Sequence, residues 1–248
     1  MEVKLLTHTP FPQKVIYSSA RQCYSKYSAY EIYTIKKKIS SKKLREFIAH
    51  LVERKHLSPL EHINFTFSVE GISRVCSHQL VRHRIASYSQ QSQRYVSMDD
   101  FKFIIPQIIV KNKKAKEKFL EVMDYLENAY YQLKEILEKD KKLDGEKINQ
   151  DLRFILPQAV QTKIVITMNA RELLHFFSER LCLRAQWEIR TLALKILSLC
   201  KKILPEVFSL AGPKCKQLKY CPENDKNCSY FKLLNGYPAC RQAGLLSC

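Results

Sequence analysis

The most informative stretch of this 248-residue sequence is Arg82-His83-Arg84-Ile85-Ala86-Ser87-Tyr88-Ser89-Gln90-Gln91-Ser92-Gln93-Arg94-Tyr95. It holds three arginines, a histidine and three serines, and it contains no acidic residue. Guanidinium groups are planar donors that suit phosphate and carboxylate oxygens, and hydroxyl and amide groups add neutral partners. Because the chain has only five glycines, a glycine-rich phosphate loop is absent. The stretch therefore predicts an anion site built from side chains, with a helix N-terminus as a further contributor.

Length and composition indicate one large globular domain, or one domain with an appendage. Hydrophobic residues make up 46% of the chain, which excludes a disordered protein. No apolar run is long enough for a bilayer span, and the first residues are too polar for a secretory signal. Nine cysteines in such a chain argue against a disulfide framework. We expect a cytoplasmic protein without membrane partners.

The net charge of +18 has two interpretations. Solvated lysines produce such values, whereas a polyanionic partner would be a nucleic acid or a phosphorylated small molecule. Many lysines lie in mixed runs such as 113–118, while the arginines cluster near 82–94 and 171–190. This separation favours discrete anion sites over one long basic surface. A basic nucleic-acid-binding protein remains the alternative.

The predicted elements mix strands and helices without strict alternation. This order favours an α+β fold, with a mixed or antiparallel sheet flanked by helices, over a doubly wound fold. Alternation and β-branched residues predict strands at 3–6, 64–70 (ended by Gly71), 101–105 and 160–167. Helical spacing predicts helices at 12–27, from 41 after a Ser40 cap, and at 72–82, 113–139, 171–181 and 185–208. A change in composition near Gly212 divides a domain at 1–211 from a cysteine-rich tail at 212–248.

A second polar motif, His56-Leu57-Ser58-Pro59-Leu60-Glu61-His62, precedes the strand at 64–70. Two histidines and a carboxylate are possible metal ligands, but their spacing is not that of a helical zinc pair. Pro59 would also break the helix that such a pair needs. We predict contacts to a ligand here, or a turn stabilised by Ser58 and Glu61.

Three blocks of the sequence resemble the flavin-dependent thymidylate synthases. Arg82-His83-Arg84, seven residues and then Ser92 match the signature motif of that family. The segment from His56 to His62 is similar to an upstream block, and the segment Asn169 to Ile189, with Arg180 inside it, is similar to a C-terminal block. The resemblance covers about residues 15–210.

This resemblance implies an α+β fold and a methyltransferase reaction. Members of the family make dTMP from dUMP, with methylenetetrahydrofolate as the carbon donor. FAD carries the hydride and NADPH reduces the FAD. They are homotetramers in which long helices pack together and more than one subunit contributes to each active site. The resemblance implies dUMP, folate and NADPH as partners, and no nucleic acid.

The resemblance also implies two sets of binding residues. The dUMP set is Gln79, Arg82, Gln90, Gln91, Ser92, Gln93, Arg94, Arg180 and Arg153, the last reaching the phosphate from a neighbouring subunit. The FAD set is Ser58, Arg82, His83, Arg84, Gln90, Asn169, Arg171 and His175. Arginines without acidic neighbours suit both the nucleotide phosphate and the flavin diphosphate.

Arg180 resembles the family arginine that lies against the uracil ring, which makes it the expected catalytic residue. A guanidinium there would favour enolate-like character in the ring, so that hydride arrives at carbon 6 without a covalent enzyme nucleophile. The rival mechanism is attack by a cysteine thiolate, and Cys182 is the candidate. On a helix, however, two residues apart point to different faces, which disfavours Cys182. Arg184 departs from the histidine that some members carry.

The cysteine-rich tail contains Cys215-x5-Cys221-x6-Cys228, which is not a standard zinc-finger spacing. With Cys182 these residues would make a four-sulfur metal site. The alternative is a set of free cytosolic thiols.

Overall fold

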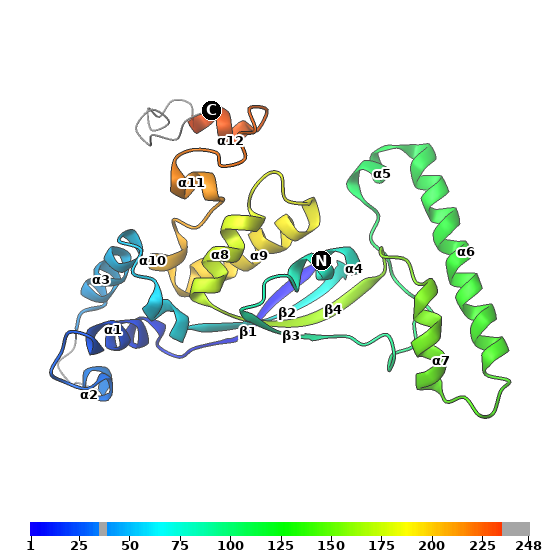
Figure 1. Cartoon of the computed structure of the whole chain (residues 1–248), viewed down its shortest axis with the longest axis horizontal. Helices are drawn as coiled ribbons and strands as arrows, with labels where there is room; N and C mark the ends of the chain where they lie inside the picture. The colour runs from blue at the N-terminus through cyan, green and yellow to red at the C-terminus, as the bar shows by residue number, and fades with distance from the viewer. Residues whose placement is uncertain (35–38, 235–248) are drawn as a thin grey trace. The chain divides into compact units, whose positions relative to one another are not determined.

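The structure of the chain, a computed structural model, describes residues 1–34 and 39–234. Its fold is α+β, as the sequence predicts, and the strands in the described residues form one antiparallel sheet in the order β1-β2-β4-β3 (Figure 1). The strands are β1 Glu2–His8, β2 Asn64–Ser73, β3 Ala86–Gln90 and β4 Gln161–Asn169. The chain divides into two compact units. Unit 1 is Met1–Lys4 with Ser68–Ile166, and unit 2 is Leu5–Phe67 with the residues from Thr167 onwards.

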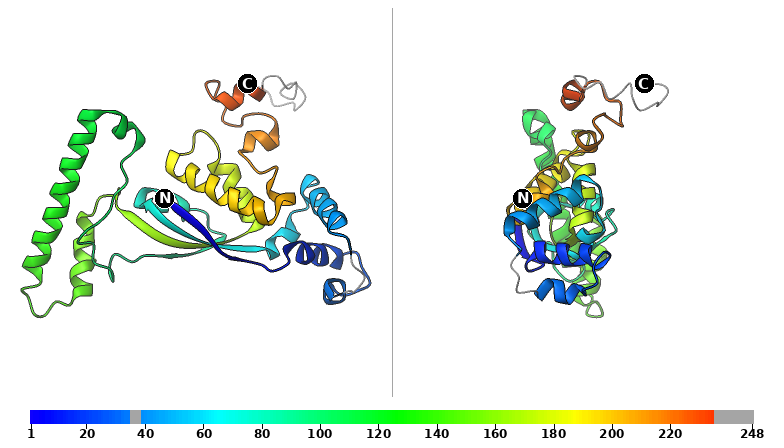
Figure 2. Two further views of the ribbon diagram at one scale, coloured as in Figure 1. Left: turned by 180° about the vertical axis from the view of Figure 1, so that it is seen from behind. Right: turned by 90° about the vertical axis from the view of Figure 1, so that its left-hand side faces the viewer.

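Unit 1 contains a pair of helices that pack side by side (Figure 2). Its helices are α4 Arg74–Leu80, α5 Gln107–Lys111, α6 Lys113–Leu137, α7 Gly145–Leu152 and the short 3₁₀ helix η2 Arg153–Ile155. Tyr130 of α6 is buried against Ile148 and Leu152 of α7. Its hydroxyl accepts from the Met98 backbone N–H at 3.2 Å and donates to Asn149 Oδ1 at 3.4 Å. The tyrosine thus fills the core between these helices without losing its polar contacts.

Unit 2 has a core rich in aromatic side chains. Its helices are α1 Pro12–Gln22, α2 Ala29–Thr34, α3 Ser41–Glu53, η1 Ser58–His62, α8 Ala170–Arg180, α9 Trp187–Ile203, α10 Pro205–Phe208, α11 Lys214–Leu218 and α12 Ser229–Leu234. Phe208 meets Phe65 and Phe177 edge to face, with ring centroids 5.7 and 5.9 Å apart. The backbone N–H of Ala170 donates to Ile63 O at 2.7 Å. The contacts of Phe65 with Phe208 and of Ala170 with Ile63 join segments that lie more than a hundred residues apart in sequence.

Most predicted elements are confirmed, including the Ser40 cap, whose side chain accepts from the Lys43 N–H. Gly71 does not end β2, because a φ of +67° lets the backbone bend while the strand continues to Ser73. The helix predicted at 185–208 is instead two helices, because Pro205 lacks an N–H and disfavours helical geometry in Leu204.

Three other boundaries were wrong. The region 101–105 makes a single bridge, Phe103 to Val160, because the chain turns at Pro157 just before β4 begins. The helix predicted at 12–27 ends at Gln22, and the arginine–serine stretch, for which no strand was predicted, contains the strand β3. Among the described residues, no helix has the length and apolar character needed to span a bilayer. The division of the chain at residue 212 stays a prediction.

Candidate functional site

The arginine–serine stretch of unit 1 is held in place by side-chain hydrogen bonds. Tyr88 on β3 donates its hydroxyl to Leu80 O at 2.9 Å and His83 O at 2.8 Å. The Gln90 amide donates to the hydroxyls of Ser77 at 3.0 Å and Thr162 at 3.1 Å. The amide is therefore fixed at the edge where β3 meets β4. Sequence reasoning missed these supporting hydroxyls, since nothing in their local sequence distinguishes them.

The predicted dUMP residues of unit 1 occupy successive positions around β3. Half-buried Gln79 lies on α4, and the exposed Arg82 and Arg84 flank buried His83 in the turn that follows. Gln91, Ser92 and Gln93 follow the strand and are half-buried, and the Gln91 N–H donates to Lys163 O at 2.9 Å. The structure thus brings the end of α4 and both ends of β3 into one unit. Their roles toward a ligand stay predictions.

The expectation that these arginines have no acidic neighbour was wrong for Arg94. Its Nη2 lies 2.5 Å from Glu146 Oε1 on α7, and its buried Nε has no hydrogen-bond partner in the described structure. The guanidinium also lies 5.5 Å from the centre of the Tyr95 ring. The sequence could not show the carboxylate, because Glu146 is 52 residues away. Arg94 is thus oriented by a carboxylate, and its Nε–H is left unpaired.

A pair of arginines in unit 1 carries uncompensated charge. Burial lowers the pKa of the Arg74 guanidinium, and the positive charge of the nearby Arg153 lowers it further. Arg153 is exposed on η2, and in the described part of the chain neither guanidinium pairs with a carboxylate. Sequence analysis singled out Arg153 but missed Arg74, whose only signal was its place between a strand and a helix. Two like charges held together without an acid are suited to an anion.

In unit 2 the predicted FAD residues gather at the start of α8. Asn169 caps this helix, its Oδ1 accepting from the Glu172 N–H at 2.8 Å. Arg171 forms an ion pair with Glu61 of η1, so the expectation of an arginine without an acidic neighbour was wrong here too. Ser58 is exposed at the first position of η1. The pairing joins the upstream and C-terminal sequence blocks in one place.

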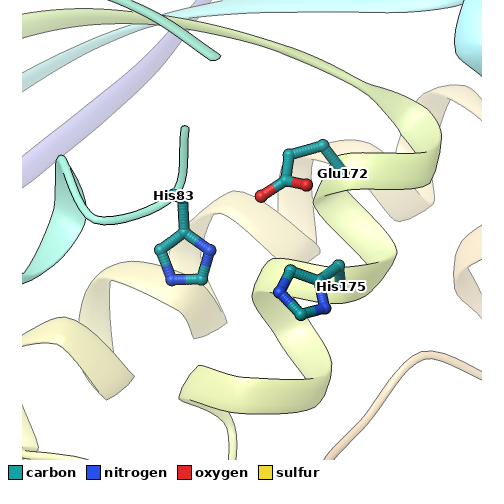
Figure 3. A group of neighbouring side chains, drawn as sticks. All are labelled: His83, Glu172 and His175. Atoms are coloured by element: carbon teal, nitrogen blue, oxygen red, sulfur yellow. The ribbon is translucent and has the colours of Figure 1, made fainter. Parts of the chain in front are cut away.

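Figure 3 shows Glu172 and His175 on consecutive turns of α8. Glu172 is buried and His175 is exposed. Burial raises the pKa of the Glu172 carboxyl, an effect that the nearby His175 partly offsets. The pair combines a carboxyl that is held toward its neutral form with a histidine on the same helix face.

A cavity of about 600 Å³ lies beside this face of α8. Arg171, Leu174 and His175 line it, together with apolar residues of α3 and α10. Lys55 and Lys219 add positive charge to its wall. The combination of apolar walls and cations fits part of a cofactor that has an aromatic system and a diphosphate.

Arg180, the last residue of α8, lines a second cavity of about 210 Å³. Cys182 lines the same cavity, and the helix-face argument that disfavoured it does not apply. The physical reason is that α8 ends at Arg180, and Cys182 lies in the turn beyond it. Arg184, in the same wall, has its Nη1 3.9 Å from Glu223 Oε2.

Comparisons with known proteins identify the family. The model of the family described as "Thymidylate synthase complementing protein" matches residues 4–206. The chain belongs to this family. A family member called flavin-dependent thymidylate synthase in Nitratidesulfovibrio vulgaris is 47% identical over 239 residues, 95% of this chain and 97% of its own length. Members with the same name in Clostridium tetani and Geobacter sulfurreducens are 45% and 44% identical, over 92% of this chain and 93% and 94% of theirs.

The family match includes both groups of candidate residues. Unit 1 contributes Arg74, the residues around β3 and Arg153, and unit 2 contributes η1 and α8, all within residues 4–206. The cysteines at 215, 221 and 228 lie beyond the matched range. The resemblance drawn from three short blocks of sequence is thereby confirmed at the level of the family.

Proposed function

We propose that this chain is a flavin-dependent thymidylate synthase, a methyltransferase that makes dTMP from dUMP. Methylenetetrahydrofolate would donate the carbon, and NADPH would reduce the FAD. The observation that carries the proposal is near-full-length identity of 44–47% to three proteins that bear this name. The arginine–serine stretch and the blocks around Glu61 and Arg171 supply the side chains that this activity needs.

In the proposed dUMP site, the residues of unit 1 recognise the nucleotide. The dUMP set remains Gln79, Arg82, Gln90, Gln91, Ser92, Gln93, Arg94 and Arg180, with Arg153 reaching the phosphate from a neighbouring subunit. We add Arg74, because its charge and that of Arg153 are uncompensated by carboxylates in the described chain and would suit a phosphate. The fixed amide of Gln90 offers its carbonyl oxygen to a pyrimidine N–H.

The proposed FAD residues of unit 2 are Ser58, Asn169, Arg171 and His175, and those of unit 1 are Arg82, His83, Arg84 and Gln90. The cavity beside α8 is chemically suited to the cofactor, because both apolar and cationic side chains line it. The cap uses only the Asn169 carbonyl oxygen, so its amide N–H groups remain able to donate. Arg171 would share its guanidinium between Glu61 and a phosphate oxygen. When bound, FAD supplies the hydride.

The proposed role of Arg180 is to polarise the uracil ring. A fixed guanidinium next to the ring stabilises negative charge that develops on the carbonyl oxygens as carbon 6 becomes electrophilic. The protein then needs no covalent nucleophile. Because Cys182 lines the same cavity as Arg180, this point must be tested directly and does not follow from helix geometry.

The test of function is release of tritium from carbon 5 of labelled dUMP. We expect release and dTMP formation only when FAD, NADPH and methylenetetrahydrofolate are all present, and a yellow protein that bleaches with NADPH. Arg180→Ala should lower kcat by about 100-fold or more, the loss typical of one electrostatic stabiliser, while FAD content stays unchanged. An unchanged kcat in Arg180→Ala would refute the polarising role of Arg180. A colourless protein that binds single strands in a salt-dependent way would instead identify a nucleic-acid-binding protein.

The absence of a covalent enzyme intermediate needs its own measurement. We expect no mass increase when the protein is denatured during turnover with 5-fluoro-dUMP, because no cysteine attacks the ring. A nucleotide adduct that maps to Cys182 would establish the rival mechanism.

We also propose a homotetramer that acts in the cytoplasm. Along α6, apolar side chains stand exposed at helical spacing, at Val122 (41%), Tyr125 (71%), Leu133 (40%) and Ile136 (61%). A second copy of the chain that packs against this stripe would bury these apolar side chains. The cysteines in the described residues are all free, which suits a reducing compartment. Light scattering of Tyr125→Glu should show dissociation, and an unchanged mass would exclude α6 from the interface.

A further inference from the structure

The segment from Lys214 to Phe231 has almost no hydrophobic core of its own. One residue in it is classed as buried, Cys215, which is 9% exposed. Cys221 and Cys228 are half-buried, while most of their neighbours are exposed. Helices as short as α11 and α12 are not stable alone, so this segment needs another means of attachment. Three of the six residues in it that are not exposed are cysteines.

These thiols meet the turn after α8 at one cavity. Cys182, Cys215, Cys221 and Cys228 all line the 210 Å³ cavity that also holds Arg180. All four are free, without disulfides. Four cysteines from two distant sequence segments therefore surround one space.

We propose that Cys182, Cys215, Cys221 and Cys228 bind a thiophilic metal centre, either a zinc ion or an iron–sulfur cluster. Four cysteines are the ligand set of structural zinc sites and of such clusters. The sulfurs are not preformed as a tight group with all atoms within 4.8 Å. Binding would thus draw α11 and the turn before α12 toward the end of α8, or enclose a cluster larger than a single ion.

The charged side chains around the cavity balance one another. Arg180, Arg184 and Lys214 line it, and so do Glu179, Glu223 and Asp225. The assignment therefore rests on the four cysteines and not on the charge of the cavity wall. Lys214 Nζ lies 2.5 Å from Glu179 Oε1, which adds a direct link between α11 and α8.

The consequence concerns the position of Arg180. Cys182 lies two residues beyond it, so a metal bound to Cys182 would fix the end of α8 and the direction of the Arg180 side chain. The metal would then act as a positioning element for the proposed catalytic arginine. This consequence rests on the proposed function, whereas the metal site does not.

Metal analysis of the whole chain, purified under reducing conditions without chelator, is the test. We expect about one zinc per chain, or about four irons with acid-labile sulfide and visible absorbance. Reconstitution with cobalt should give thiolate-to-metal charge-transfer bands if zinc is the native metal. Less than about a tenth of an equivalent of metal, both as purified and after reconstitution, would overturn the site. Disulfides among these cysteines, seen by mass after alkylation, would overturn it too.

A matched pair of variants assigns the ligands. Cys228→Ser should weaken retention of the metal against a competing chelator by about 10-fold or more. Cys23→Ser, an exposed cysteine of the same unit that does not line the cavity, should retain the metal like the parent. Equal retention by the two variants would refute the assignment. If Cys228→Ser fails to fold, protection of four thiols from alkylation in the parent chain, lost on metal removal, tests the same point.

Discussion

Removal of the Tyr88 hydroxyl tests how the arginine–serine stretch is held. In Tyr88→Phe the carbonyls of Leu80 and His83 lose a donor that now lies at 2.9 and 2.8 Å. One hydroxyl proton serves both acceptors, so the loss is nearer to one good hydrogen bond than to two. A net hydrogen bond contributes about 1 kcal/mol, and leaving part-buried acceptors unsatisfied brings the total to about 1–2 kcal/mol.

The assay is thermal unfolding combined with steady-state kinetics. For a chain of this length about 1 kcal/mol corresponds to about 2–4 °C, so we expect the Tm to fall by about 2–8 °C. The KM for dUMP should rise more than kcat falls, because the hydroxyl orients the turn between α4 and β3 but touches no reacting atom. Tyr24→Phe is the matched control, since that residue is 86% exposed. A Tm equal to the control, or a loss confined to kcat, would refute this reasoning.

Three further changes test other parts of the structure. Gly71→Ala should lower the free energy of unfolding, measured in urea, by about 1–2 kcal/mol, because φ is +67° and the added Cβ would lie 3.2 Å from Met1 N. The control Gly145→Ala, whose Cβ would meet nothing within 4 Å, should be neutral or stabilising. Equal effects of the two substitutions would contradict backbone strain at Gly71. Asn169→Ala should lose about 1 kcal/mol of helix capping, and Asn169→Asp should restore it; equal losses in the two variants would exclude the cap. Burial raises the pKa of Asp99, but hydrogen bonds from Lys134 and Ser97 and the charge of Lys134 outweigh it, so the pKa is lowered overall. The Asp99–Lys134 pair therefore stabilises the fold above about pH 4, and this contribution is lost as Asp99 is protonated at lower pH. Asp99→Asn should therefore cost less than about 1 kcal/mol at pH 7 and still less at pH 3, and a cost that does not change with pH would exclude the pair.

Local patterns predicted the long elements well because their causes are local. The spacing in α6 and the Ser40 cap of α3 depend on residues within one or two turns, and both predictions were confirmed. The apolar stripe of α6 could face the core of its own chain or a second subunit, and in the described structure only Met123 and Tyr130 of α6 are buried. Sequence periodicity alone cannot separate these two destinations, since both need the same apolar face.

Local patterns could not predict contacts between residues that lie far apart in sequence. Glu146 neutralises Arg94, and Glu61 pairs with Arg171, but no local pattern connects partners so far apart. Arg74 was missed for the same cause, since its significance comes from Arg153. The candidate residues themselves were named from motif matches, and the structure adds which of them share a unit and which carboxylates they face.

The order of segments along unit 2 has a consequence for synthesis on the ribosome. Leu5–Phe67 is complete early, yet its partners begin only at Thr167, after about a hundred further residues. At about 5–20 residues per second, the first half of unit 2 waits at least about 5–20 s before Ala170, Arg171 and Phe208 emerge to cover it. During this interval the ring of Phe65 remains without its contact to Phe208. Nascent chains stalled before Thr167 are thus expected to depend on chaperones, while those released after Phe208 are not.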